Sequence, residues 1–204
     1  MYNIIVVGDS IAAGRKVEKS KSWPMLLAKE IDEHDKDLTL VHNLSIPGDK
    51  SSSILDRLER ELPQRCRKKY PDDHSAIIFS FGINDAKRDL KSHLLSTPAN
   101  LFAKNCRLIA DIGLKYADKV IFIGLTPINE EKTKSGEEFS LSVGDWEDYD
   151  KMIKNVCLEK ELKSIALIGQ WGESETTESL LEDGIHPNEL GHRKIFDSIK
   201  PEII

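Results

Sequence analysis

Cysteine is scarce in this chain, and the three that occur, Cys66, Cys106 and Cys157, stand far apart. No C-x-x-C pair is present, so the sequence lacks the signature of a zinc knuckle or of a redox dithiol. An odd number of lone cysteines is typical of a reducing compartment rather than of a disulfide framework. We therefore expect three small buried thiols and neither a metal nor a cofactor.

Long apolar runs are also missing. No stretch approaches the ~20 apolar residues that a membrane-spanning helix needs. The N-terminus has no basic segment followed by a cleavable apolar one, because it begins directly with a strand-like run. These absences predict a cytoplasmic protein with no membrane span, although a chain whose signal peptide had been removed would show the same pattern.

The chain also lacks an excess of positive charge. The net charge of -6 argues against nucleic acid or an anionic membrane as the main partner, because both require a basic face. One short basic cluster, formed by Arg65, Arg67, Lys68 and Lys69, is interpreted as a solvated helix face. We expect a small molecule as the partner.

Short apolar runs alternate with helical patterns along the whole chain. The runs cover residues 4–7, 38–44, 76–81, 119–125 and 164–168. Most of them lack a clean polar–apolar alternation, which is typical of strands that are covered on both faces. Apolar residues at helical spacing lie between them, at 23–31, 54–62, 101–112 and 152–158, and a last helix is expected to start near Pro187.

This alternation predicts one α/β domain over residues 1–204. Because crossovers between parallel strands are right-handed, the expected fold is a three-layer α/β/α sandwich with a five-stranded, parallel, flavodoxin-like sheet. Two polar connections, 86–100 and 129–145, are predicted to be long loops, the second of them mobile.

Polar residues follow the predicted strands. In an open parallel sheet, ligands bind beyond the carboxyl ends of the strands. The residues expected there are Gly8, Asp9 and Ser10 after the first strand, Gly48 after the second, Asn84 and Asp85 after the third, and Asp183 and His186 before the last helix. A serine, backbone and amide donors, an imidazole and a carboxylate are the groups that acyl transfer requires.

Each residue type suits one step of such a reaction. The hydroxyl of Ser10 becomes a good nucleophile only when an imidazole such as that of His186 takes its proton. Asp183 precedes His186 by three residues, so its carboxylate can orient the ring. Oxyanion donors are worth roughly 3–4 kcal/mol each, and the candidates are the backbone N–H groups of Gly48 and Ser10 and the amide of Asn84.

These four blocks resemble those of the SGNH hydrolases, also called the GDSL esterase/lipase family. The blocks are Gly8-Asp9-Ser10, the segment 43–48, Gly82-x-Asn84-Asp85 and Asp183-x-x-His186, and they occur in the family's order. The resemblance implies Ser10 as nucleophile, His186 as base and Asp183 as its orienting acid. It also implies an oxyanion hole made by Ser10, Gly48 and Asn84, with no metal. One departure is Ile11, where leucine is common.

Structural roles remain open for several of these residues. Asp9 or Ser10 could cap a helix, and Gly48 could serve only a tight turn. Asn84 and Asp85 could form an Asx-turn or a cap.

The last block has alternatives of its own. Asp183 could cap the final helix, with His186 on the surface. A metal site built from Asp183, His186 and His192 is conceivable but has no recognised spacing.

The sequence favours a serine esterase that cleaves small or medium acyl esters. A carbohydrate O-acetyl esterase is the alternative within the hydrolases, and a non-catalytic flavodoxin-like binding module is the alternative outside them. The loop at 8–14 has a single hydroxyl, too few for a flavin phosphate site, and no nucleotide-binding glycine motif occurs. The connections 86–100 and 129–145 are expected to border the acyl pocket and to set substrate choice.

Overall fold

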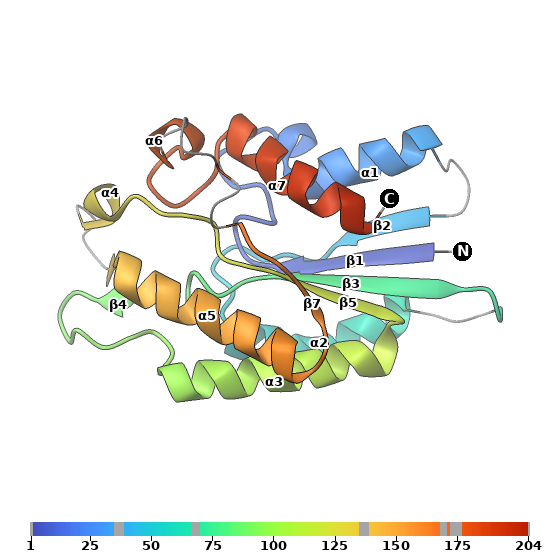
Figure 1. Ribbon diagram of the computed structural model, residues 1–204, viewed down its shortest axis with the longest axis horizontal. Coiled ribbons are helices and arrows are strands. Elements are labelled where there is room, and N and C mark those ends of the chain that lie inside the picture. Colours follow the sequence, from blue (N-terminus) through green and yellow to red (C-terminus); the bar gives the residue numbers. More distant parts are fainter. Residues whose placement is uncertain are drawn as a thin grey trace.

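A parallel sheet forms the centre of the molecule, with helices on both of its faces (Figure 1). The computed structural model describes residues 2–34, 39–66, 70–134, 139–167, 171 and 177–203. The strands are β1 (Tyr2–Gly8), β2 (Thr39–Asn43), β3 (His74–Ser80), β5 (Lys119–Ile123) and β7 (Lys163–Ile165). Each overlaps one of the five apolar runs; residues 38 and 168, at the ends of two runs, lie outside the described residues.

The strand order confirms the predicted topology. The strands lie in the order β2-β1-β3-β5-β7, and every pair is parallel. In chain order this is 2-1-3-4-5, the flavodoxin-like arrangement. β1 lies between β2 and β3, and its residues from Asn3 to Gly8 are all buried. The end of β1 therefore opens at the centre of the sheet edge, where ligands bind in this topology.

Two groups of helices cover the sheet. They are α1 (Trp23–His34) and α7 (Glu189–Ile203) on one face, and α2 (Ser51–Arg65), α3 (Ala99–Tyr116) and α5 (Val143–Glu159) on the other (Figure 1). The last helix begins two residues after Pro187, close to the predicted start. Two shorter elements, the 3-10 turn η1 (Lys19–Lys21) and the helix α6 (Thr177–Leu180), contact α7.

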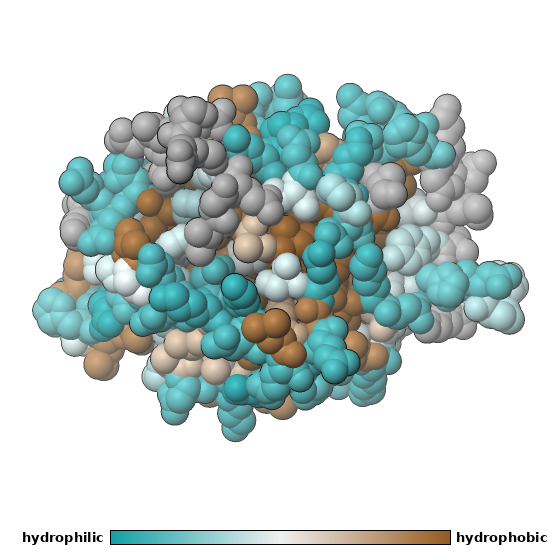
Figure 2. Space-filling view, in the orientation of Figure 1, coloured by the Kyte–Doolittle hydropathy of each residue, from teal (hydrophilic) through white to brown (hydrophobic). Residues whose placement is uncertain are grey.

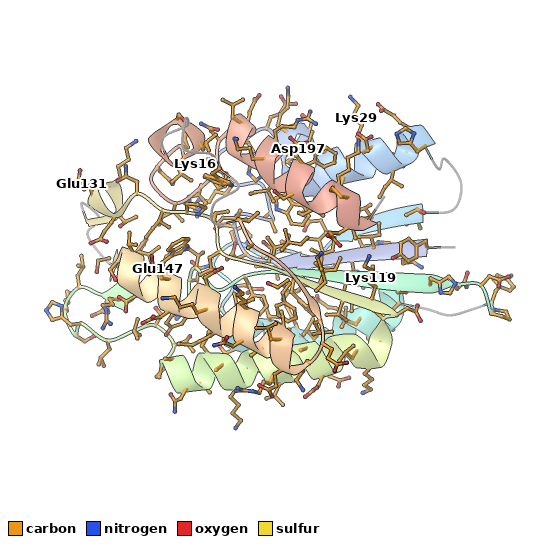
Figure 3. The ribbon with its side chains drawn as sticks, viewed as in Figure 1. Lys16, Lys29, Lys119, Glu131, Glu147 and Asp197 are labelled. Carbon is orange, nitrogen blue, oxygen red and sulfur yellow. The ribbon has the colours of Figure 1, made fainter. Side chains whose placement is uncertain are left out.

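Hydrophilic residues cover most of the visible face, and hydrophobic ones show between the helices (Figure 2). The charged side chains labelled in Figure 3, such as Lys29, Glu147 and Asp197, lie on the outside of the helical layers.

All three cysteines are buried free thiols, as expected. Of the basic cluster, Arg65 ends α2, whereas residues 67–69 lie outside the described part. No helix in the described ranges combines the length and apolar character needed to cross a membrane.

The two long connections are not simply loops, which corrects the prediction. Residues 86–100 include β4 (Arg88–Asp89), and residues 129–145 include α4 (Glu130–Lys134) and β6 (Phe139–Ser140) and reach into α5. β4 pairs with β6 in a small antiparallel sheet. Elements of two to five residues are too short to show a hydrophobic period. They form because tertiary contacts hold them, so sequence periodicity could not reveal them.

An ion pair fastens this small sheet to α5. The guanidinium of Arg88 makes two hydrogen bonds of 2.7 Å to the carboxylate of Asp145. The hydroxyl of Ser142, the N-cap of α5, accepts the backbone N–H of Asp145. A bidentate pair of this kind fixes orientation as well as distance. The β4–β6 sheet therefore has a defined position beyond the carboxyl edge of the main sheet.

Candidate active site

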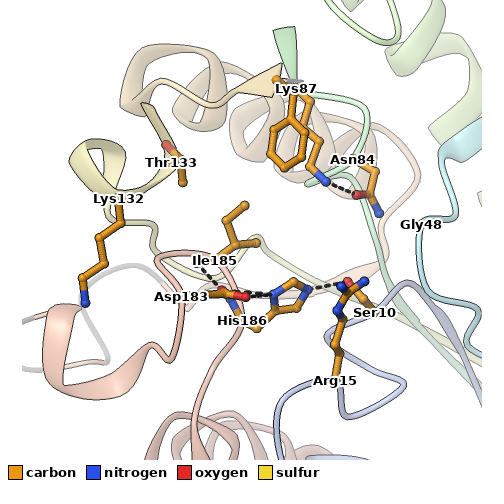
Figure 4. Close-up of a pocket in the computed structure, with 11 residues that line it drawn as sticks. Ser10, Arg15, Gly48, Asn84, Lys87, Lys132, Thr133, Asp183, Ile185 and His186 are labelled. Carbon is orange, nitrogen blue, oxygen red and sulfur yellow. Dashed lines mark hydrogen bonds and ion pairs between the residues drawn. The ribbon is translucent and has the colours of Figure 1, made fainter. Parts of the chain in front are cut away.

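One cavity at the carboxyl edge of the sheet brings the predicted site residues together (Figure 4). Ser10 follows β1, Gly48 follows β2, Asn84 follows β3, and Asp183 and His186 come from the segment before α7. All five line a cavity of about 310 Å³. Residues far apart in the chain therefore meet at the point that the parallel topology favours for ligands.

The turn after β1 holds Ser10 in place. A Cβ on Gly8 would collide with the carbonyl oxygen of Ser80, so only glycine lets β1 pass so close to β3 before it turns. The carboxylate of Asp9 accepts the backbone N–H of Ile11 at 2.9 Å; because residues 9–17 form a turn and not a helix, the suggested helix cap at Asp9 or Ser10 is wrong. The backbone of Ser10 accepts a hydrogen bond from the N–H of Arg15. Ser10 thus lies in a compact turn.

Ser10, His186 and Asp183 form a hydrogen-bonded line. Oγ of Ser10 lies 2.9 Å from Nε2 of His186. On the other side of the ring, Nδ1 lies 2.8 Å from Oδ2 of Asp183 and 3.0 Å from its Oδ1. The geometry matches the arrangement predicted for a nucleophile, a base and an orienting acid. The side chain of His186 is only 11% exposed, so the alternative of a surface histidine is wrong.

Asp183 has a second task in the same turn. Its Oδ1 accepts the backbone N–H groups of Ile185 at 3.2 Å and of His186 at 2.9 Å. The carboxylate therefore shapes the turn that carries His186 and also contacts the ring. The predicted capping role and the predicted orienting role are compatible, although the capped backbone belongs to this turn rather than to α7.

The charge state of the pair suits proton transfer. Burial lowers the pKa of His186; Asp183 opposes this effect, and the positive charges of Arg15 and Lys87 add to it. Burial acts against ionisation of Asp183, but hydrogen bonds from the backbone and ring of His186 outweigh it and lower the pKa of the carboxyl. At neutral pH the imidazole is therefore neutral and can accept a proton, while Asp183 is a carboxylate.

Gly48 takes a conformation that other residues rarely adopt. Its φ is +89°, and a Cβ placed on it would meet no atom within 4 Å. The glycine is thus required by backbone conformation and not by crowding. The turn it makes is the structural role that the sequence suggested, and its position in the cavity wall is compatible with a second role as a donor.

The amide of Asn84 is held at both ends. Its Nδ2 donates to the backbone oxygen of Asp49 at 3.0 Å, and its Oδ1 accepts from Nζ of Lys87 at 2.8 Å. Because an amide nitrogen carries two hydrogens, one N–H remains for a ligand in the cavity. Lys87 was not singled out by the sequence, where a lysine three residues after an asparagine carries no recognisable signal.

Asp85 acts as a cap, but for a distant helix. Its buried carboxylate accepts the backbone N–H of Ser51 at 2.9 Å and the hydroxyl of Ser51 at 2.7 Å. Burial raises the pKa of Asp85, and hydrogen bonds from Ser51 and Thr97 oppose that rise. The carboxylate ties the end of β3 to the start of α2, and so fixes Asn84 relative to the loop that carries Gly48.

His192 does not join the cavity. It is fully buried in α7, and its Nδ1 accepts the backbone N–H of Trp23 at 3.3 Å. Burial lowers the pKa of His192 to about 4. This histidine therefore packs α7 against the start of α1, which gives no support to the metal site suggested with Asp183 and His186.

Six further residues complete the cavity. They are Arg15, Lys87, Lys132, Thr133, Phe139 and Ile185 (Figure 4 draws them and labels all but Phe139). Lys132 and Thr133 come from α4, Phe139 comes from β6, and Lys87 precedes β4. The segments 86–100 and 129–145 therefore do border the cavity, as the sequence indicated. Which side chains they contribute depended on the short elements that the sequence did not reveal.

Comparisons with known proteins agree with this geometry. A family model described as the GDSL-like lipase/acylhydrolase family matches residues 6–194. An arylesterase of Vibrio mimicus is 28% identical over 203 residues, covering 98% of this chain and 88% of that protein. The esterase TesA of Pseudomonas aeruginosa is 26% identical over 200 residues, and the match covers 98% of this chain and 87% of TesA.

Solved structures share the fold. A lipase/acylhydrolase from Enterococcus faecalis has a TM-score of 0.78 and 25% identity, and the match covers 100% of this chain and 95% of the other. An acetyl xylan esterase, AlAXEase, also has a TM-score of 0.78, with 20% identity and coverage of 99% and 100%. At 20% identity, the similarity to the acetyl xylan esterase shows a shared three-layer fold and nothing more.

Proposed function

The chain belongs to the GDSL-like lipase/acylhydrolase family, and we propose that it hydrolyses small or medium acyl esters with Ser10 as its nucleophile. The general class, a serine esterase or acylhydrolase, follows from the family and from relatives named as esterases. The observation that supports the specific assignment is the line from Ser10 through His186 to Asp183 in the cavity wall.

The reaction would proceed in two steps. Oγ of Ser10 attacks the ester carbonyl carbon while Nε2 of His186 takes the hydroxyl proton. The tetrahedral intermediate then collapses, the alcohol leaves with the proton from His186, and Ser10 keeps the acyl group. In the second step His186 takes a proton from water, which attacks the acyl-enzyme. The acid leaves, and Ser10 regains its proton.

Three donors would stabilise the tetrahedral oxyanion. They are the backbone N–H groups of Ser10 and Gly48 and the remaining amide N–H of Asn84. Such donors help most when they are fixed before the reaction, because no reorganisation is then needed. The turn after β1 fixes Ser10, the left-handed conformation fixes Gly48, and Asp49 and Lys87 hold the amide of Asn84.

The size of the cavity supports a small or medium acyl group. About 310 Å³ is at the lower end of the range for ligand pockets. Its apolar side chains are Phe139 and Ile185, and most of the rest of its wall is polar or charged. A carbohydrate O-acetyl esterase is the second candidate, because a small polar cavity also suits an acetyl group on a polar alcohol.

The test is hydrolysis of 4-nitrophenyl esters from acetate to octanoate by the wild type, Ser10→Ala and Ser20→Ala. Ser20 is an exposed serine outside the cavity and serves as the matched control. We expect Ser10→Ala to lower kcat by at least about 10³-fold and Ser20→Ala to leave it unchanged.

A fluorophosphonate probe followed by peptide mapping reports the nucleophile independently. We expect the label on Ser10 in the wild type and on no residue in Ser10→Ala. Activity or labelling that survives in Ser10→Ala would disprove the assignment. Relative rates on acetylated sugars and on longer acyl esters separate the two candidate functions.

A further inference from the structure

The catalytic cavity carries positive charge although the whole chain is acidic. The net charge of the chain is -6, yet Arg15, Lys87 and Lys132 all line this one cavity. Among the described residues that line it, the one acid is Asp183, whose carboxylate is engaged with the ring and the backbone of His186. Charge of one sign gathered in a cleft attracts ligands of the opposite sign.

Lys87 is a half-buried cation that binds no carboxylate among the described residues. Its Nζ donates to the neutral amide oxygen of Asn84 and lies 4.0 Å from the ring centre of Phe139. Burial lowers the pKa of Lys87, and the positive charges of Arg15 and Lys50 add to this effect, whereas Asp9 and Asp183 oppose it. Removing a cation from water without a counter-ion costs free energy, so an anionic ligand would be favoured there.

Arg15 lies at the exposed mouth of the same cavity, in the turn that follows Ser10. In the described part of the chain its side chain has neither an ion pair nor a hydrogen bond, whereas Arg57, Arg88 and Arg107 each bind a carboxylate. Its charge acts on the site, because it contributes to the lowered pKa of both His186 and Lys87. A guanidinium in this position can bind a carboxylate or a phosphate with two hydrogen bonds.

Other acids near the site are already engaged. The carboxylate of Asp49 binds Arg57 at 2.8 Å, and that of Asp85 binds the backbone and hydroxyl of Ser51. Asp9 is buried, and burial raises its pKa to about 7, so much of it is uncharged near neutral pH. Asp9 and Asp183 favour the charge of Lys87 at a distance, but no described carboxylate forms an ion pair with Arg15 or Lys87.

We propose that the preferred substrates are esters that carry an anionic group, a carboxylate or a phosphate, within reach of Arg15 and Lys87. This inference rests on the proposed function, since it names the substrate class of the same cavity. The anion would supply a direct counter-charge that none of the described residues provides. It would thereby hold the ester next to Ser10.

The experiment compares charged esters with uncharged partners of nearly the same shape. Mono-4-nitrophenyl adipate against 4-nitrophenyl adipamate places a carboxylate in the acyl group. 4-Acetoxybenzoate against 4-acetoxybenzamide places it in the alcohol, and 4-acetoxyphenyl phosphate against 4-acetoxyphenyl dimethyl phosphate tests a phosphate. We expect kcat/KM for at least one charged ester to exceed that of its partner by about tenfold.

Two measurements assign such a preference to the cavity. Arg15→Gln is expected to reduce the charged-to-neutral ratio of kcat/KM by about tenfold, while Lys29→Gln, an exposed lysine on α1, leaves the ratio unchanged. Raising sodium chloride from about 50 mM to about 500 mM is expected to reduce the wild-type ratio as well, because salt screens the attraction.

The outcomes separate the two proposals. The anionic substrate class would be overturned if the enzyme hydrolysed neutral esters and preferred none of their charged partners. It would also be overturned if a preference existed that neither Arg15→Gln nor salt reduced. Either result would leave the esterase assignment intact. No hydrolysis of any ester together with no fluorophosphonate label on Ser10 would overturn the esterase assignment itself, and this inference with it.

Discussion

The ammonium of Lys87 lies 2.8 Å from Oδ1 of Asn84 and so holds the acceptor end of an amide that lines the candidate active-site cavity. The other fixed point of this amide is the backbone oxygen of Asp49. Two contacts thus prevent the amide from rotating. A cation at Oδ1 also withdraws electron density from the amide, which strengthens its N–H groups as donors.

Removal of the Lys87 charge is therefore expected to affect the chemical step. For a neutral ester, Lys87→Met should lower kcat by about tenfold with a smaller change in KM, because the donor it positions acts mainly in the transition state. Lys87→Arg should recover part of this loss, and Asn84→Ala should lose about 10²- to 10³-fold. Steady-state kinetics on 4-nitrophenyl acetate decide the matter; an effect confined to KM would contradict the positioning role.

The acid limb of the pH–rate profile should report His186. Burial lowers the pKa of this histidine below 6.5, and only the neutral ring accepts a proton. Accordingly kcat/KM should reach half of its plateau below pH 6.5. In Asp183→Asn the plateau should fall by about 10²- to 10⁴-fold. The midpoint should move to lower pH, because Asp183 raises the pKa of His186. A midpoint above 6.5, or one unmoved in the variant, would contradict this account.

Gly48→Ala should impair activity through the backbone. A left-handed conformation costs a residue with a Cβ about 1–2 kcal/mol, so the loop would relax and displace its N–H. We expect a similar loss in the free energy of unfolding and at least a tenfold fall in kcat. Gly144→Ala is the matched control, because that glycine also has open space around it but lies in α5. Denaturation curves and kcat that match in the two variants would show that Gly48 has no special role.

Asp9 should make stability depend on pH. Its folded pKa is about 7, because burial opposes ionisation, against an ordinary value of 3.8. Between these values the unfolded chain releases this proton and the folded chain retains it. The contribution of Asp9 is therefore complete below about pH 3.8 and is lost as the pH rises through 7.

Asp9→Asn removes this titration. Between pH 4 and pH 8 the free energy of unfolding of the wild type should fall by about 2–4 kcal/mol more than that of the variant. Urea denaturation at several pH values measures the difference, and groups common to both proteins cancel. Parallel pH profiles would show that Asp9 is ionised in the folded protein.

Phe139 should limit the length of the acyl group. It comes from β6 and, with Ile185, supplies the apolar part of the cavity wall. Phe139→Ala enlarges the cavity, so the ratio of kcat/KM for octanoate to that for acetate should rise several-fold. Leu94→Ala is the control, because Leu94 is 69% exposed on the 86–100 segment and does not line the cavity. An equal change in both variants would assign chain-length preference elsewhere.

Point substitutions are preferable here to removal of the whole segment 129–145. That segment includes α4, β6 and Ser142, the N-cap of α5. Its deletion would also remove Asp145, the partner of Arg88. A truncated protein would therefore lose packing as well as a part of the cavity wall, and its kinetics would not isolate substrate choice.

Much of this protein was determined by its sequence. The five strands follow from apolar runs that are covered on both faces, and their parallel order follows from the helices between them. Ser10, Gly48, Asn84, Asp183 and His186 converge because each lies at the end of a strand or just before the last helix. Parallel strands bring their carboxyl ends to one edge, so position along the chain was sufficient.

The tertiary structure alone decided what surrounds Ser10, His186 and Asp183. The β4–β6 pairing, the cap that Asp85 provides for α2, and the cations Arg15 and Lys87 in the cavity wall all depend on contacts between distant segments. Short elements have no period, and a charged side chain looks alike in the sequence whether it faces water or a cavity. The sequence could therefore place the candidate site residues at one edge of the sheet, whereas only the packing of the chain determined the charge and shape of the cavity around them.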